Sequence, residues 1–220
     1  MKDFSVIFDM DGVIIINSEF HVKAWDVFCK KYDIILSDYD IKNYILGTTN
    51  KTALDHIFKG TLSEDEVLKF SDEKELTYRT LYKPYLKENK GVIDFLKLLK
   101  QNHIKIALAT SAQPSNLDFI VDNLKIRGYF DFIIHAMQVN EGKPNPEIYL
   151  KAAKGIHEDP NKCIVIEDSI PGIKSALSAN MKVIAITTTH KKDELKDASL
   201  IIDSFSELNM EVLESLINKG

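Results

Sequence analysis

The chain has 220 residues, 45% of them hydrophobic, and its 28 Lys and Arg against 33 Asp and Glu give a net charge of −5. A chain of this length buries roughly 70% of the surface that it exposes when unfolded, so it can form a core without disulfides or structural metals. This excludes a disulfide-stapled miniprotein. The acidic balance also disfavours nucleic acid as a partner, because a protein that binds a phosphate backbone normally carries a basic excess.

Neither a membrane span nor an export signal is indicated. The longest apolar stretch near the N-terminus covers residues 13–16, far fewer than the ~20 residues that a spanning helix requires. The opening MKDFSVIFD has an apolar core too short, and too acidic, for a secretory signal. Cys29 and Cys163 belong to no CxxC or Cys/His pattern, which argues against a disulfide framework or a zinc site. We expect a cytoplasmic monomer.

Short apolar runs rich in β-branched residues alternate with segments of helical spacing. The runs are continuous rather than alternating in polarity, which is typical of parallel strands covered on both faces. The predicted strands are 4–8, 104–109, 132–134, 163–166, 183–186 and 200–202. The predicted helices are 92–100, 116–124, 146–154, 171–179 and 205–217. This rhythm of βαβ units predicts an α/β fold with a Rossmann-like, three-layer core around a parallel sheet.

The interval between the first two strands breaks this rhythm. It holds helical patterns at 18–32, 37–46, 51–58, 63–70 and 71–83. Ser63 and Glu66 have the spacing of a capping box, and Gly47 and Gly60 stand at expected helix ends. We therefore predict an all-helical cap domain, 17–84, inserted into a core of 1–16 and 85–220.

Polar residues follow the predicted strands at the ends where an open parallel sheet binds its ligands. They are Asp9 and Asp11 after the first strand, Thr110 and Ser111 after the second, Lys143 after the third, and Glu167 and Asp168 after the fourth. Acids, hydroxyls and a lysine on one edge describe a site for a phosphoryl group and a hard divalent cation.

The chemistry assigns a different task to each of these residues. Asp9 and Asp11 are two positions apart, so both carboxylates point the same way in an extended chain. One can attack phosphorus while the other handles the proton of the leaving group. Mg²⁺ held by Asp9 and Asp168 would offset their repulsion of an anionic phosphate. Lys143 would add a fixed positive charge, and Thr110 a hydrogen bond.

Each segment alone also has an ordinary structural interpretation. Asp11-Gly12 is a hairpin-turn signal, and Thr110-Ser111 could be a helix N-cap. The segments 142–146 and 167–169 could be plain helix entries. All of these would have to coincide at consecutive strand ends, and that conjunction favours the functional interpretation.

Two other acid-rich sites fit less well. An EF-hand also begins Asp-x-Asp, but Val13 stands at its third ligand position. A receiver-type phospho-acceptor domain places its lysine last along the chain, whereas Lys143 precedes Glu167 here. Such domains are also shorter and lack a helical insertion.

Four segments resemble the four motifs of the haloacid dehalogenase superfamily. They are FDMDGV at 8–13, ATS at 109–111, GKPNPEIY at 142–149 and VIEDSIPGI at 165–173. The inserted cap resembles the β-phosphoglucomutase-like branch of that superfamily. True dehalogenases lack the second acid of the first motif, so Asp11 favours phosphoryl transfer.

The resemblance implies a role for each matching residue. Asp9 would be the nucleophile that forms an aspartyl phosphate, and Asp11 the general acid and then base. The phosphate-binding residues would be Thr110, Ser111 and Lys143, and the Mg²⁺ site would draw on Asp9, Asp11, Glu167 and Asp168. The substrate would be a small phosphorylated metabolite.

The cap carries both likenesses and departures. His21 matches a histidine that positions the acid/base in the mutases, and the cap loop includes Gly47, Thr48, Asn50 and Lys51 as candidate substrate contacts. Asn50 stands where the mutase arginine grips the second phosphate.

Other departures concern the rest of the chain. The run Ala112-Gln113-Pro114 replaces the Ser-Lys-Asn of the mutases, and loss of two charge-assisted contacts favours transfer to water. Ile16 replaces an Asp found before the cap in many relatives, so Asn17 or Ser18 would cap the next helix.

The sequence therefore predicts a Mg²⁺-dependent phosphatase of small phosphorylated metabolites, with sugar phosphates as candidates. A β-phosphoglucomutase-type isomerase is the first alternative, and a non-catalytic phosphometabolite-binding protein the second. Lys51 invites comparison with the Schiff-base lysine of phosphonoacetaldehyde hydrolases, but it is one residue out of register after Gly47.

Overall fold

The computed structural model describes residues 4–45 and 48–218, apart from the side chains of residues 42 and 43. The chain forms two compact units, one of residues 1–16 with 87–220 and one of residues 17–86. We call the first the core unit and the second the helical unit, and each is described by itself.

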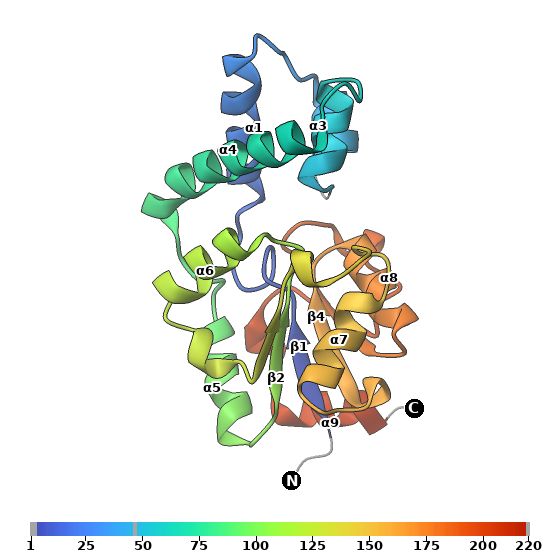
Figure 1. Ribbon diagram of the computed structural model, residues 1–220. Coiled ribbons are helices and arrows are strands. Elements are labelled where there is room, and N and C mark those ends of the chain that lie inside the picture. Colours follow the sequence, from blue (N-terminus) through green and yellow to red (C-terminus); the bar gives the residue numbers. More distant parts are fainter. Residues whose placement is uncertain (1–3, 46–47, 219–220) are drawn as a thin grey trace. The chain divides into compact units, whose positions relative to one another are not determined.

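The core unit is built on a six-stranded parallel sheet in the order β3-β2-β1-β4-β5-β6 (Figure 1). The strands are β1 Ser5–Phe8, β2 Ile106–Ala109, β3 Phe132–Ile134, β4 Cys163–Glu167, β5 Lys182–Ile186 and β6 Leu200–Ile202. Strands β1, β2 and β4 are buried along their whole length. Their continuous apolar runs indeed mark strands covered on both faces.

Helices cover both faces of this sheet, which confirms the predicted three-layer fold. Helices α7 and α8 pack on one face through an apolar cluster that includes Ile7 of β1, Val165 of β4 and Tyr149 of α7. The next side chain along β1, Phe8, points to the opposite face. There its ring centroid lies 6.0 Å from that of Phe95 in α5.

The helices of the core unit begin and end close to the predicted positions. They are α5 Val92–Gln101, α6 Pro114–Asn123, α7 Glu147–Gly155, α8 Ile170–Ser178 and α9 Met210–Asn218. The prediction of one helix over 205–217 was wrong, because a short 3-10 turn, Phe205–Glu207, precedes α9. Leu208 and Asn209 separate the two, and Asn209 Oδ1 accepts the N–H of Val212 at 3.0 Å as an N-cap would.

The helical unit consists of α1 Ser18–Lys31, α2 Asp38–Asp40, α3 Asn50–Ile57 and α4 Glu64–Tyr82, with a π-helical turn at Ile41–Ile45. The capping box of Ser63 and Glu66 is present at the start of α4. The predicted boundary at residue 71 was wrong, because α4 is continuous there and Ser71 is buried within it. Among the described residues, no helix is long and apolar enough to cross a membrane.

The packing of the helical unit is aromatic. Trp25 and Phe28 of α1 and Leu54 of α3 form its buried apolar cluster, with Phe58 and Phe70 packed against it. The rings of Phe28 and Phe70 have centroids 5.7 Å apart, which ties α1 to α4.

Candidate active site

Three carboxylates meet at the carboxyl edge of the sheet, where the strand order reverses between β1 and β4. Asp9 directly follows β1, and its N–H extends the sheet by donating to the carbonyl of Ile166 at 3.0 Å. Glu167 is the last residue of β4, and Asp168 comes next. All three are buried, and each places an oxygen within 4.8 Å of the others. The edge of an open α/β sheet at such a reversal is where ligands bind.

The Lys143 ammonium joins this acid cluster from the loop before α7. Its Nζ lies 2.5 Å from Asp9 Oδ1 and 2.6 Å from Glu167 Oε1, and the side chain is only 8% exposed. Burial alone would lower the pKa of Lys143, but the two carboxylates raise it well above its usual value. Lys143 is therefore a fixed positive charge beside Asp9.

Glu167 is held by protein donors on both of its oxygens. Oε1 accepts from Lys143 and from the hydroxyl of Tyr149 at 2.7 Å. Oε2 accepts the N–H groups of Asp168 and Ser169 at 2.9 and 3.0 Å, and also the Ser169 hydroxyl. Burial by itself raises the pKa of Glu167, but Lys143 and these hydrogen bonds hold it below its usual value. This ionised carboxylate anchors the lysine.

Lys143 offsets only part of the charge of the three carboxylates, so ionisation of the two aspartates is opposed. Burial raises the pKa of Asp9 well above its usual value despite Lys143, and the neighbouring carboxylates add to the rise. Burial and the Glu167 carboxylate raise the pKa of Asp168 to about 7. A buried group of oxygen donors with surplus negative charge fits a hard divalent cation such as Mg²⁺. The donor set and its charge thus suit the predicted metal.

The turn after β1 carries Asp11 and requires the glycine that follows it. The Met10 carbonyl accepts from the N–H groups of residues 13–15, which closes a tight turn. Gly12 has a φ of +80°, and a Cβ at this position would overlap the Asp168 carboxylate. Asp11 is partly exposed, and it lies outside the group of three mutually close carboxylates that the described residues form.

Thr110 and Ser111 follow β2 in different environments. Thr110 is buried, and its hydroxyl accepts the N–H of Ala112 at 3.0 Å. Ser111 is exposed. The N-cap position of α6 belongs to Gln113, so the alternative that Thr110-Ser111 is an ordinary helix cap is wrong.

The other structural alternatives have mixed outcomes. Asp11-Gly12 is not a hairpin turn, because β1 pairs in parallel with both of its neighbours. Ser169 is the N-cap of α8, and its hydroxyl accepts an N–H of the first turn. Asn145 Oδ1 accepts the N–H of Glu147 at 2.9 Å at the start of α7. The same segments therefore begin helices and also supply the acid cluster.

In the helical unit, His21 belongs to a polar group shared by α1 and α4. Its ring stacks on Tyr78 with centroids 3.9 Å apart, and Lys74 Nζ lies 2.9 Å from Nδ1. Burial, together with the Lys74 charge, lowers the pKa of His21 to about 3. The imidazole is thus neutral, and its Nδ1 accepts from the lysine.

Asn50 contacts a buried acid of the same polar group. Its Nδ2 donates to Glu75 Oε1 at 2.8 Å, and Lys74 Nζ lies 2.8 Å from the same oxygen. Glu75 is 4% exposed and Lys74 2%. The position predicted to replace the mutase arginine therefore holds an amide bound to a buried carboxylate.

The remaining cap candidates make local, exposed contacts. The Thr48 hydroxyl donates to the carbonyl of Tyr44 at 2.7 Å. Lys51 pairs with Asp55 one turn along α3 at 3.1 Å, and its side chain is 71% exposed. Gly47 lies outside the described residues.

The start of α1 differs from the prediction. Asn17 occupies the N-cap position but makes no capping hydrogen bond with its side chain. Its Nδ2 instead donates to the Tyr78 hydroxyl at 2.6 Å. The amide therefore ties α1 to α4, and the preceding Ile16 is 52% exposed.

Several residues in contact with the predicted ones were not identified from the sequence. Tyr149, which donates to Glu167, could have been found as a tyrosine on the inner face of a motif helix. Thr189, whose hydroxyl donates to Asp168 Oδ2, follows the fifth predicted strand, and that position was the available signal. No sequence signal identified Lys74 and Glu75, because charged helix residues are normally exposed.

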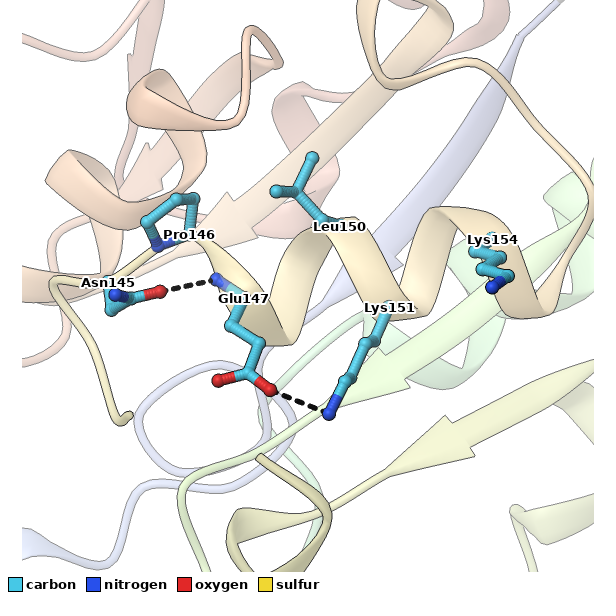
Figure 2. Close-up of a pocket in the computed structure, with 6 residues that line it drawn as sticks. All are labelled: Asn145, Pro146, Glu147, Leu150, Lys151 and Lys154. Atoms are coloured by element: carbon cyan, nitrogen blue, oxygen red, sulfur yellow. Dashed lines mark hydrogen bonds and ion pairs between the residues drawn. The ribbon is translucent and has the colours of Figure 1, made fainter. Parts of the chain in front are cut away.

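A surface pocket on α7 lies apart from the acid cluster. Figure 2 shows the side chains that line it, all on α7 or the turn before it. Glu147 and Lys151 pair with each other there at 2.6 Å. These two partly buried groups offset each other's charge, and the pocket includes none of the predicted site residues.

The fold and the acid cluster define a Rossmann-like α/β enzyme with its charged groups at the switch point of a parallel sheet. The family described as haloacid dehalogenase-like hydrolase matches residues 6–186. The chain belongs to this family.

The named relatives include phosphatases and a β-phosphoglucomutase. A phosphorylated carbohydrates phosphatase of Thermotoga maritima is 31% identical over 82% of this chain and 83% of its own length. A β-phosphoglucomutase of Bacillus subtilis is also 31% identical, over 95% of this chain and 93% of its own length. The family and its phosphatase relatives make the chain a haloacid dehalogenase-like phosphohydrolase, with phosphoglucomutase as the runner-up.

Solved structures agree with this assignment. A family IA haloacid dehalogenase hydrolase from Entamoeba histolytica superposes with a TM-score of 0.91 at 33% identity, covering 98% of this chain and 100% of the other. A β-phosphoglucomutase from Clostridium difficile superposes with a TM-score of 0.86 at 31% identity, covering 99% and 98%.

Proposed function

We propose that this protein is a Mg²⁺-dependent phosphatase of small phosphorylated metabolites that works through an aspartyl phosphate on Asp9. The observation that carries the proposal is the buried contact between Asp9 and Lys143 beside Asp168. A nucleophile, a phosphate-binding cation and a metal ligand then share one edge of the sheet. The core unit would perform the catalysis, and the helical unit would serve as a cap that shapes the pocket and limits water.

The protein's own residues divide the reaction into two transfers. An Asp9 oxygen attacks phosphorus, the bond from phosphorus to the leaving oxygen breaks, and Asp11 donates a proton to that oxygen. Asp11 then takes a proton from a water molecule, which attacks the aspartyl phosphate, releases inorganic phosphate and restores the Asp9 carboxylate. Partial exposure of Asp11 suits a group that exchanges protons with leaving group and water.

Lys143 and Thr110 would bind the phosphate oxygens. The ammonium offers charge-assisted hydrogen bonds, and the Thr110 hydroxyl, which accepts from Ala112, can donate its own hydrogen. Ser111 would offer a backbone N–H beside them.

Asp9 and Asp168 would hold Mg²⁺, which when bound neutralises charge on the phosphoryl oxygens. Glu167 would support the site through Lys143 rather than bind the metal directly, because both of its oxygens already accept from protein donors. Asp11 would be reserved for proton transfer.

The helical unit supports hydrolysis over isomerisation. A mutase must grip a second phosphate, and its cap arginine serves that purpose. Asn50 occupies this position here and is bound to the Glu75 carboxylate, so a neutral amide replaces the charge that would grip a second phosphate. His21, Thr48 and Lys51 would contact or position an uncharged leaving group such as a sugar. Gly47 belongs to the same proposed loop.

Phosphate release from a panel of phosphorylated metabolites tests the proposal. We expect release that depends on Mg²⁺ and is abolished by Asp9→Asn, which keeps the size of the side chain but removes the nucleophile. The surface variant Asp193→Asn, a matched acid-to-amide change, should release phosphate like the wild type. Equal release by Asp9→Asn would refute the nucleophile assignment.

A mutase is the second candidate, because the Bacillus subtilis enzyme of that name matches nearly the whole chain. Conversion of β-glucose 1-phosphate to the 6-phosphate, faster than free phosphate appears, would establish it. Calorimetric binding of phosphorylated ligands without turnover of any ester would instead establish a binding protein. The cytoplasmic location and the monomeric state stay predictions.

A further inference from the structure

Three consecutive threonines follow β5 and belong to none of the four motifs. The hydroxyl of Thr188 donates to the carbonyl of Gly12 at 2.6 Å. The hydroxyl of Thr189 donates to Asp168 Oδ2. The hydroxyl of Thr187 donates away from the acid cluster, to Asp203 Oδ1 at 2.6 Å. Two of these hydroxyls therefore reach the proposed site, and the third does not.

The sheet fixes the place of this loop. Strand β5 lies next to β4, with Ala185 paired to Glu167, so the chain leaves β5 directly beside Asp168. The backbone is held as well, because the N–H of Thr187 donates to Ile202 and that of Thr188 to Ile186, both at 3.0 Å. The hydroxyls consequently have defined directions.

The Thr189 contact acts on the orientation of a carboxylate. A carboxylate that binds a metal through one oxygen can rotate about its last side-chain bond unless its other oxygen is held. The hydrogen bond on Asp168 Oδ2 restricts this rotation. Such outer hydrogen bonds orient metal ligands and typically account for about 10- to 100-fold in metal affinity.

The Thr188 contact acts on the turn that carries the proposed acid/base. The Gly12 carbonyl belongs to the residue directly after Asp11, and the φ of Gly12 is +80°, a left-handed backbone conformation that glycine adopts readily. The Met10 carbonyl accepts from the N–H groups of residues 13–15, and the Thr188 hydroxyl adds a second hydrogen bond on the carbonyl side of the Gly12–Val13 peptide. A displaced Gly12 peptide would turn Asp11 away from the leaving oxygen.

We propose that Thr188 and Thr189 are positioning residues of the phosphatase site. Thr189 orients Asp168 for the cation, and Thr188 holds the turn that presents Asp11. This inference rests on the proposed function. It adds a loop after β5 that no sequence motif contains.

Valine and serine variants of the three threonines test it on the full-length protein. Valine keeps the shape but removes the hydroxyl, serine restores the hydroxyl, and Thr187→Val is the matched control from the same loop. Thr189 is exposed, so its variants should fold, and thermal melting checks this. Mg²⁺ binding to the metal-stripped protein is measured by titration calorimetry, with MgCl₂ as the titrant.

For Thr189→Val we expect Mg²⁺ affinity to fall about 10- to 100-fold, with Thr189→Ser close to the wild type and Thr187→Val equal to it. For Thr188→Val we expect unchanged Mg²⁺ affinity, a kcat lower by roughly 10- to 100-fold, and a changed pH profile of kcat, since the acid/base is displaced. A purely structural role would lower the melting temperature and leave these readouts unmoved.

Mg²⁺ affinity of Thr189→Val equal to that of Thr187→Val would overturn the role of Thr189. An unchanged kcat and pH profile in Thr188→Val would overturn the role of Thr188. If the wild type neither binds Mg²⁺ nor depends on it for phosphate release, the proposed function fails and takes this inference with it. The two failures are therefore distinguishable.

Discussion

The core unit and the helical unit each bury a lysine against carboxylates, and the two arrangements differ in charge balance. Lys143 faces a group of three buried carboxylates. Lys74 lies against one buried carboxylate, Glu75, and a neutral imidazole. The core arrangement has more carboxylates than lysines, which favours the binding of a metal cation. The helical arrangement has matched charge and holds two helices together.

Removal of Lys143 should affect catalysis, whereas removal of Lys74 should affect stability. The largest effect is expected for Lys143→Met. The variant removes the cation that holds Asp9 and would bind phosphate. We expect kcat/KM for phosphate release to fall by roughly 100- to 1,000-fold, as for loss of one preorganised donor. Lys154→Met removes an exposed lysine from the far end of α7 and is the control. Retention of more than a tenth of the activity would show that Lys143 does not bind the phosphate.

Lys74→Met should act on stability first. It leaves the Glu75 carboxylate buried without that ammonium, a change that typically costs about 3–5 kcal/mol. Hydrogen exchange of α1 and α4 measures the stability of the helical unit directly. The double variant Lys74→Met/Glu75→Gln should recover much of the loss, because no buried charge is left behind. A double variant as unstable as the single one would show that packing of the lysine stem, not charge, is what matters.

The same contrast explains which parts could be predicted from the sequence. In the core unit, every strand ends at the same edge, so residues that follow strands, such as Asp9 and Asp168, must converge. Strand positions follow from continuous apolar runs, and the six predicted strands were confirmed within two residues. The topology of a parallel sheet therefore predicts that residues far apart in the sequence form one cluster.

The helical unit offers no such rule. Which helix faces meet depends on side-chain packing. The contacts of Lys74 with His21 and of Asn50 with Glu75 could therefore not be predicted from the sequence. The division of α4 at residue 71 failed for a related reason. Serine is a common helix start, but Ser71 is buried within α4, and tertiary packing overrides the local signal.

The stability of the helical unit should also depend on pH, because it contains the titratable ring of His21. The pKa of His21 is lowered from 6.5 to about 3, so the unfolded chain binds a proton that the folded helical unit does not. Its contribution is fully present above pH 6.5 and is lost as the pH falls through the range from 6.5 to about 3. At pH 5 the loss is about 2 kcal/mol.

Hydrogen exchange of α1 and α4 between pH 5 and pH 8 measures this loss in the wild type and in His21→Gln. The variant lacks the titrating ring and should lose less stability on acidification. His103→Asn, in an exposed position of the core unit, is the control and should follow the wild type. Parallel losses in all three proteins would mean that His21 is not held neutral.

The smallest effect is expected for Lys51→Met, because this lysine is exposed, unlike Lys143 and Lys74. The Lys51 ammonium is 71% exposed and pairs with an Asp55 side chain that is 42% exposed. Solvent screens such a pair, so the stability of the helical unit should change by less than about 0.5 kcal/mol. The kcat for phosphate release should also stay near the wild-type value, because loss of a contact to the leaving group acts on KM. A Schiff-base lysine needs burial or a neighbouring cation to become nucleophilic, and an exposed, acid-paired ammonium has neither. Borohydride trapping of a substrate on Lys51, or loss of turnover in Lys51→Met but not in the control Lys59→Met, would reverse this conclusion. The covalent step would then lie on an exposed lysine of the helical unit and not on Asp9 of the core unit.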